Sequence, residues 1–119
     1  MRVLLVEDNA ELRGFLEQTL AEAAIEAVPT SAAGEALRRL ETEKFDALIL
    51  DSDLGDADGI TLTGQIRATK SGRQMPILLM SSVGTALARR MAQTAGCNQF
   101  LAKPFGPAQF VESVRGMDK

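Results

Sequence analysis

The chain contains no histidine, and it has a single cysteine among its 119 residues. Without histidine it cannot build the Ser-His-Asp or Cys-His arrangements of many hydrolases, and few ligand combinations are left for a zinc site. The cysteine, Cys97, cannot form an internal disulfide. We interpret it as a small residue near the start of a strand rather than as a redox centre. Any phosphohistidine chemistry needs the histidine of a partner protein.

Strong positive charge and long apolar segments are also absent. The formal net charge is -3 and the pI is about 4.9, so with no basic cluster a nucleic-acid-binding surface is not expected. No apolar run approaches the roughly 18 residues of a membrane span, and the first residues lack the regions of a signal peptide. We therefore expect a cytoplasmic protein without membrane contact. The length fits one domain, with 45% hydrophobic and 24% charged residues.

Short apolar runs alternate with segments in which apolar residues recur at helical spacing. Continuous apolar runs are typical of buried strands in a parallel sheet. The order predicts five repeats of strand then helix, with right-handed crossovers and helices on both faces of the sheet. The apolar stripes of the helices, including Met91, are expected to lie in the core. The expected strands are 3–6, 25–28, one that ends at residue 51, 77–80 and 99–102. The expected helices are 10–24, one opened by residues 30–31, 60–68, 87–96 and one that begins near residue 107.

Acidic residues and one lysine directly follow three of these apolar runs. Glu7 and Asp8 follow the first run, Asp51 follows the third, and Lys103 follows the last. In open α/β sheets ligands bind outside the carboxyl ends of the strands, so these side chains are expected to converge on one site. Crowded carboxylates repel each other unless a cation lies between them, and their hard oxygen atoms favour Mg²⁺. A metal ion and a lysine ammonium together would hold a phosphoryl group.

Four segments at the predicted strand ends carry a family resemblance. They are Val6-Glu7-Asp8-Asn9, Leu50-Asp51 followed by Asp58-Gly59, Met80-Ser81-Ser82, and Phe100-Leu101-Ala102-Lys103-Pro104-Phe105. Together they resemble the receiver domain of bacterial two-component response regulators, in the single-domain form of chemotaxis regulators. The resemblance implies one receiver domain over residues 1–119, with a flavodoxin-like (βα)5 fold and a five-stranded parallel sheet. It also implies a signalling switch rather than an enzyme, phosphorylated by a sensor histidine kinase or a histidine phosphotransfer protein.

The resemblance further implies a role for each site residue. Asp51 would be the phosphoacceptor, and a cis bond to Pro104 would aim the ammonium of Lys103 at the phosphoryl oxygens. Ser81 would contact the same oxygens, although a turn residue at a strand end explains this serine equally well. Phe100 would be the aromatic switch residue and would shift inward together with Ser81 on phosphorylation. The residues expected to hold Mg²⁺ are Glu7, Asp8, Asp51 and, through its backbone carbonyl, Asp53.

Several residues depart from the usual pattern of the family. Gly55 stands where a proline is common after the phosphoacceptor, which predicts a looser loop. The side chains of the loop residues Asp56 and Asp58 are expected to be only solvated. Uncharged residues replace charges that DNA-binding members often carry, so we expect a monomer or weak dimer that acts on a downstream protein effector. These uncharged residues are Asn98, Gln99 and Ser113.

Two other functions stay open. The segment Asp51-Ser52-Asp53 after an apolar run also matches the start of haloacid-dehalogenase-type phosphatases, in which the first aspartate attacks and the second protonates the leaving group. That motif normally lies on the first strand, Gly55 replaces its usual Thr or Val, and the chain is short for that fold. An unphosphorylated, receiver-like interaction domain is the other alternative. Turnover of a phosphomonoester would separate the phosphatase from the receiver.

Overall fold

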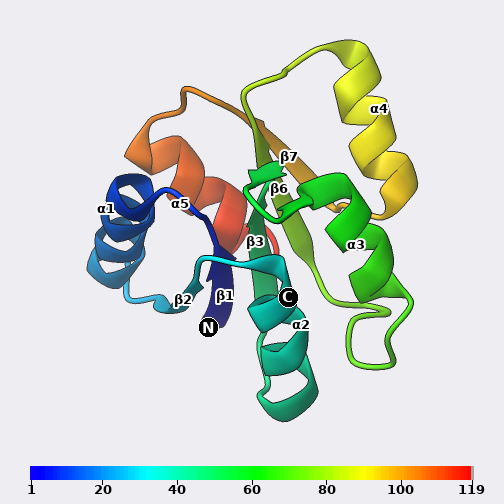
Figure 1. The fold of residues 1–119 in the computed structure, drawn as a ribbon. Coiled ribbons are helices and arrows are strands. Elements are labelled where there is room, and N and C mark those ends of the chain that lie inside the picture. The colour runs from blue at the N-terminus through cyan, green and yellow to red at the C-terminus, as the bar shows by residue number, and fades with distance from the viewer. Residues whose placement is uncertain (119) are drawn as a thin grey trace.

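A five-stranded parallel sheet forms the centre of the molecule (Figure 1). The computed structural model describes residues 1–118. The order of the strands in the sheet is β2-β1-β3-β6-β7, which is the order of flavodoxin-like sheets, so the predicted fold class is confirmed. The strands are β1 (Arg2–Val6), β2 (Glu26–Thr30), β3 (Ala47–Asp51), β6 (Ile77–Ser81) and β7 (Gln99–Ala102).

Helices cover both faces of the sheet (Figure 1). The buried residues of α1 (Ala10–Glu22) and α5 (Pro107–Arg115) share one apolar cluster. Those of α2 (Ala33–Thr42), α3 (Gly59–Arg67) and α4 (Ala86–Ala95) share the other. Among residues 1–118, no helix combines the length and the apolar character needed to cross a membrane.

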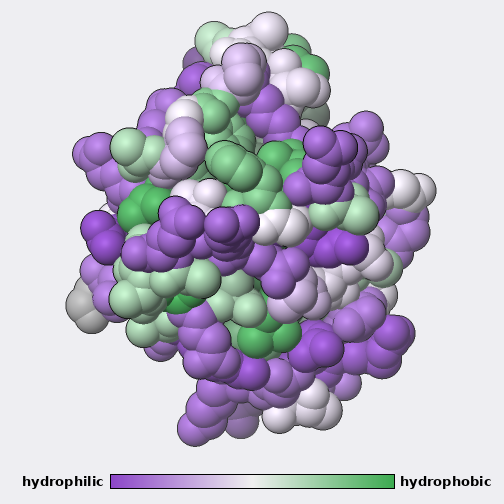
Figure 2. Space-filling model, turned by 90° about the vertical axis from the view of Figure 1, so that its left-hand side faces the viewer, coloured by the Kyte–Doolittle hydropathy of each residue, from purple (hydrophilic) through white to green (hydrophobic). Residues whose placement is uncertain are grey.

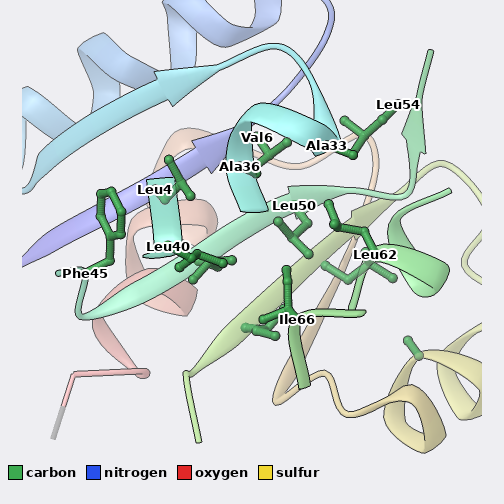
Figure 3. Packing of buried hydrophobic residues seen from close by; sticks show 14 residues of the cluster. Leu4, Val6, Ala33, Ala36, Leu40, Phe45, Leu50, Leu54, Leu62 and Ile66 are labelled. Carbon is green, nitrogen blue, oxygen red and sulfur yellow. The ribbon is translucent and has the colours of Figure 1, made fainter. Parts of the chain in front are cut away.

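Successive residues of the central strands alternate between the two apolar clusters. In β3, Leu48 and Leu50 pack on the side of α2 and α3, whereas Ala47 and Ile49 pack on the side of α1 and α5. Figure 3 shows the cluster on the side of α2 and α3, with Leu50 and its neighbours between the strands and the helices. Because helices cover both faces, both sets of strand side chains must be apolar. This requirement explains the continuous apolar run that ends at Asp51.

Apart from shifts of one or two residues at other ends, the structure differs from the expected boundaries in three places. Helix α1 ends at Glu22 instead of reaching Ala24, because Ala24 adopts a left-handed conformation with a φ of 61°. Strand β2 extends to Thr30, which pairs with Val6 of β1. The expected loop between β3 and α3 contains a short antiparallel hairpin, with strands β4 (Asp53–Leu54) and β5 (Ala57–Asp58).

Two helices carry large apolar residues on the surface. Leu87 and Met91 of α4 are 67% and 50% exposed, and Phe15 of α1 is 50% exposed, so the prediction that places the apolar stripes of the helices in the core is wrong for these three residues. Helix α4 packs through the small side chain of Ala92. Leu87 and Met91 are four residues apart and share another face of the helix. Figure 2 shows the side of the molecule where α1 lies, and there hydrophilic side chains separate the hydrophobic areas.

Candidate functional site

The carboxyl ends of three strands bring residues from distant parts of the sequence together. Glu7 and Asp8 follow β1, Asp51 is the last residue of β3, and Lys103 follows β7. Strands β1 and β3 are neighbours, and from them the chain adds strands in opposite directions along the sheet. Crossovers that lead away in opposite directions leave a crevice at the strand ends, which is where ligands bind in such sheets.

Three carboxylates form a cluster at this edge of the sheet. One oxygen from each of Glu7, Asp8 and Asp51 lies within 4.8 Å of the others. Glu7 and Asp51 are buried and Asp8 is exposed, so the cluster opens to solvent on the side of Asp8. Oxygen ligands with one open side suit a small divalent cation that keeps some of its water ligands. The three carboxylates are therefore close enough to share one metal ion.

Glu7 is the most deeply buried member of this cluster. Its Oε2 accepts a hydrogen bond from the N–H of Asn9 at 3.1 Å, but within the described residues its Oε1 has no hydrogen-bond partner. Burial raises the pKa of Glu7 to about 7, with a smaller contribution from Asp51, against the lowering effects of the Asn9 bond and Lys103. Because an unpartnered buried oxygen is costly, a bound cation would supply a missing contact here.

Lys103 lies between two of the carboxylates. Its Nζ donates a hydrogen bond to Asp51 Oδ2 at 3.1 Å and lies 3.6 Å from Glu7 Oε1. The peptide bond between Lys103 and Pro104 is cis, as expected. The backbone N–H of Lys103 donates to the carbonyl of Ser81 at 2.7 Å, which joins this lysine to the end of β6. The ammonium therefore offsets part of the repulsion between the carboxylates.

The loop after Asp51 passes close to the site. Asp51 Oδ1 accepts a hydrogen bond from the N–H of Asp53 at 3.3 Å, whereas the side chain of Asp53 is exposed. The contribution expected from Asp53 is its backbone carbonyl, and this stays a prediction. Gly59 closes the loop by donating its N–H to the carbonyl of Ser52 at 2.9 Å. A Cβ on Gly59 would lie 2.4 Å from the carbonyl oxygen of Asp51, so only glycine lets α3 begin so close to β3.

The two expected switch residues lie in β6 and β7. Ser81 is buried, and its Oγ accepts from the N–H of Val83 at 3.0 Å and donates to the carbonyl of Val83 at 3.2 Å. Phe100 is half-buried, and the guanidinium of Arg89 lies 4.7 Å from the centre of its ring. A hollow of about 210 Å³, lined in part by Ala92, adjoins this ring. The bonds of Ser81 are those of a turn residue, and its contact with a phosphoryl group stays a prediction.

Two loop aspartates that were expected to be only solvated bind the starts of helices. Both carboxylate oxygens of Asp56 lie 3.2 Å from the backbone nitrogen of Ala33 in α2, and Asp58 Oδ1 accepts from the N–H of Ile60 in α3 at 2.9 Å. The prediction is therefore wrong for both residues. An aspartate just before a helix is a recognisable N-cap signal, which applies to Asp58. Asp56 lies 23 positions from Ala33, and no local pattern reveals their contact.

Comparison with known proteins identifies the family. A family model described as the response regulator receiver domain matches residues 3–115. The chain belongs to this receiver family. The receiver domain of the sensor histidine kinase PA1611 from Pseudomonas aeruginosa PAO1 is 30% identical, with a TM-score of 0.89 and coverage of 98% of this chain and 95% of that chain. Its structure holds a magnesium ion in the active site cleft.

Relatives of greater length contain a similar receiver domain. The alkaline phosphatase synthesis transcriptional regulatory protein PhoP of Bacillus subtilis (strain 168) is 28% identical over 116 residues, which are 98% of this chain and 48% of PhoP. The transcriptional regulatory protein GltR of Pseudomonas aeruginosa is 29% identical over 97% of this chain and 48% of its own length. The chain thus spans about half the length of the curated relatives it matches. The resemblance to the receiver family is confirmed, and the function is that of a receiver domain of two-component response regulators.

Proposed function

We propose that this receiver accepts a phosphoryl group on Asp51 in a Mg²⁺-dependent reaction and thereby changes its affinity for a protein effector. The observation that carries the proposal is the surroundings of Asp51. Its carboxylate ends a buried strand, lies in a cluster with Glu7 and Asp8, and accepts a hydrogen bond from Lys103 at 3.1 Å. An aspartate that attacks phosphorus needs positive charge beside it, because nucleophile and phosphoryl group are both anionic.

The reaction is a displacement at phosphorus. A carboxylate oxygen of Asp51 forms a bond to the phosphorus of a phosphohistidine, and the bond between phosphorus and nitrogen breaks. The electron pair of that bond stays on the nitrogen and the imidazole takes up one proton, so the products are an aspartyl phosphate and a histidine. Residues 1–119 contain no histidine, so the phosphohistidine lies outside them, and we propose that it belongs to a sensor histidine kinase or a histidine phosphotransfer protein. The ammonium of Lys103 and the hydroxyl of Ser81 contact the transferred phosphoryl oxygens.

The residues around Asp51 fit a magnesium ion. Glu7, Asp8 and Asp51 offer only oxygen ligands, and the unpartnered Oε1 of Glu7 lies among them. The backbone carbonyl of Asp53 is the further ligand that we expect. When bound, the ion offsets the negative charge of the phosphoryl group. The magnesium site in the cleft of the PA1611 receiver domain supports this assignment.

Phosphorylation then biases an equilibrium between two conformations. Ser81 and Phe100 shift inward in the phosphorylated form, and the surface made by α4, β7 and α5 changes its affinity for the effector. A 100-fold change in affinity corresponds to about 2.7 kcal/mol of differential interaction. We propose that residues 1–119 act as one such switch and do not turn over a substrate. The phosphatase alternative receives less support, because Asp51 ends the third strand of the chain and the side chain of Asp53 is exposed.

Labelling with a radioactive acyl phosphate tests the proposal, with Asp51→Asn and Asp53→Asn as matched variants. Wild type and Asp53→Asn should incorporate phosphate in a form that hydroxylamine removes, whereas Asp51→Asn should incorporate none. Unchanged labelling of Asp51→Asn would mean that another residue is the acceptor. Repeated turnover of a phosphomonoester by wild type, lost in Asp53→Asn, would establish the phosphatase instead.

A further inference from the structure

A backbone amide from a distant loop holds the exposed carboxylate of Asp8. Asp8 Oδ2 accepts a hydrogen bond from the N–H of Gly55 at 3.0 Å, although the two residues are 47 positions apart. We propose that the amide of Gly55 positions Asp8 for binding of a divalent cation. This role rests on the metal site of the proposed function, and it makes Gly55 a positioning residue that does not itself touch the ion.

The loop that carries Gly55 is fixed independently of Asp8. Leu54 is only 3% exposed and packs in the cluster on the side of α2, and the carboxylate of Asp56 binds the N–H of Ala33. The residues on either side of the turn pair as the antiparallel strands β4 and β5. These contacts hold the amide in place from both sides. The amide can therefore fix the carboxylate, and the carboxylate is not needed to fix the loop.

The hydrogen bond leaves one oxygen of Asp8 available for a metal ion. An exposed aspartate without such a bond samples several rotamers and loses that freedom when it binds an ion. Hydrogen bonds to metal-binding side chains commonly change metal affinity by roughly 10- to 100-fold. Because Asp8 is exposed, we expect an effect at the lower end of this range, about tenfold.

Two substitutions at position 55 separate the hydrogen bond from the shape of the loop. Neither Gly55 nor Asp56 has a positive φ, which fits a type I turn whose first central position accepts proline. Gly55→Pro therefore removes the N–H with little change in the backbone. A Cβ at position 55 would lie 3.4 Å from Asp8 Oδ2, an ordinary contact, so Gly55→Ala keeps both the N–H and the space.

Calorimetric titration of Mg²⁺ into the unphosphorylated protein tests the proposal. Wild type and Gly55→Ala should bind with affinities within about twofold of each other, and Gly55→Pro should bind about tenfold more weakly. Equal or tighter binding by Gly55→Pro would overturn the positioning role, while the metal site itself would stand. Failure of wild type to bind Mg²⁺ would instead refute the metal site of the proposed function, and the positioning role with it.

A second measurement does not depend on whether proline is tolerated. In ¹H–¹⁵N spectra, Asp8→Ala should shift the amide proton of Gly55 upfield, because that proton loses its charged acceptor. Glu11→Ala is the matched control, since Glu11 is an exposed acidic residue in the first turn of α1, and it should leave the Gly55 signal in place. A Gly55 amide that is unmoved in Asp8→Ala would overturn the proposal.

Discussion

The ammonium of Lys103 donates a hydrogen bond to Asp51 Oδ2 at 3.1 Å, and this bond joins the end of β7 to the end of β3. The backbone N–H of the same lysine is bonded to the carbonyl of Ser81 in β6 at 2.7 Å. Strand β7 also carries Phe100, whose ring is in contact with Arg89 of α4. A change of charge or bonding at Asp51 therefore acts directly on the strand that carries the expected switch residue.

Lys103→Ala should permit some phosphorylation of Asp51 but weaken the conformational response, because the ammonium ties the phosphoryl group to β7. The measurement is the set of ¹H–¹⁵N shifts caused by beryllofluoride with Mg²⁺. Shifts around Phe100 and α4 should be large in wild type and in Lys70→Ala, where an exposed lysine is removed, and small in Lys103→Ala. Shifts of equal size in Lys103→Ala would show that the lysine does not couple the site to β7.

Removal of Mg²⁺ should strongly slow phosphorylation, because the carboxylates of Glu7, Asp8 and Asp51 otherwise repel an incoming phosphoryl anion. With a chelator present, labelling from a small acyl phosphate should slow by roughly 100-fold or more, and excess Mg²⁺ should restore it. Undiminished labelling in the chelator would contradict the metal role. The same experiment with a phosphorylated kinase as donor shows whether it is the receiver or the small acyl phosphate that requires Mg²⁺.

The sequence predicts the sheet and the converging site residues well, because both depend on local patterns. A buried parallel strand needs a continuous apolar run, and the polar residue that follows the run marks the strand end. The contacts between loops could not be predicted in this way, as the pairing of Asp56 with Ala33 shows. The burial of Met91 was predicted wrongly because periodicity shows which residues share a helix face, but not which face packs. In α4 the small residue Ala92 makes the packed face.

Without metal, the free energy of unfolding should fall as the pH rises from about 4.5 to 7. Burial raises the pKa of Glu7 from its ordinary value of 4.5 to about 7, so over this range the folded state keeps a proton that the unfolded state has released. The glutamine in Glu7→Gln carries no charge, so the free energy of unfolding of this variant should not show the fall with pH that is due to Glu7. In a chelator it should be more stable than wild type at pH 8 by about 3 kcal/mol, and nearly equal to it at pH 4.5.

Urea unfolding at several pH values measures this difference, with Glu11→Gln as the exposed control. The control should follow the pH dependence of wild type, because Glu11 is exposed. If Glu7→Gln shows the same slope with pH as wild type, the buried carboxyl of Glu7 does not cause the pH dependence.

Gly59→Ala should lower the free energy of unfolding by about 3 kcal/mol through overpacking. Its Cβ would lie 2.4 Å from the carbonyl oxygen of Asp51 and 2.8 Å from the Cα of Ser52, and these backbone atoms cannot move aside cheaply. Gly64→Ala is the matched control in the same helix, because a Cβ there meets nothing within 4 Å. It should stabilise the protein by about 0.5–1 kcal/mol, since alanine is the better helix former. Chemical unfolding checks both, and a neutral Gly59→Ala would show that the start of α3 can shift away from β3.

Activation should leave this receiver a monomer or at most a weak dimer. Asn98 Oδ1 accepts hydrogen bonds from the N–H of Ile77 at 2.8 Å and from Arg67 at 3.0 Å, so this amide already has partners within its own chain. Gln99 and Ser113 add no charge, and without charge pairs an interface here lacks electrostatic attraction and the specificity that charge pairs give. Sedimentation with and without beryllofluoride and Mg²⁺ should give the same monomeric species at micromolar concentrations. A tight dimer that forms on activation through α4, β7 and α5 would contradict the prediction, and it would mean that the exposed apolar face of α4 pairs with a second copy rather than with a separate effector.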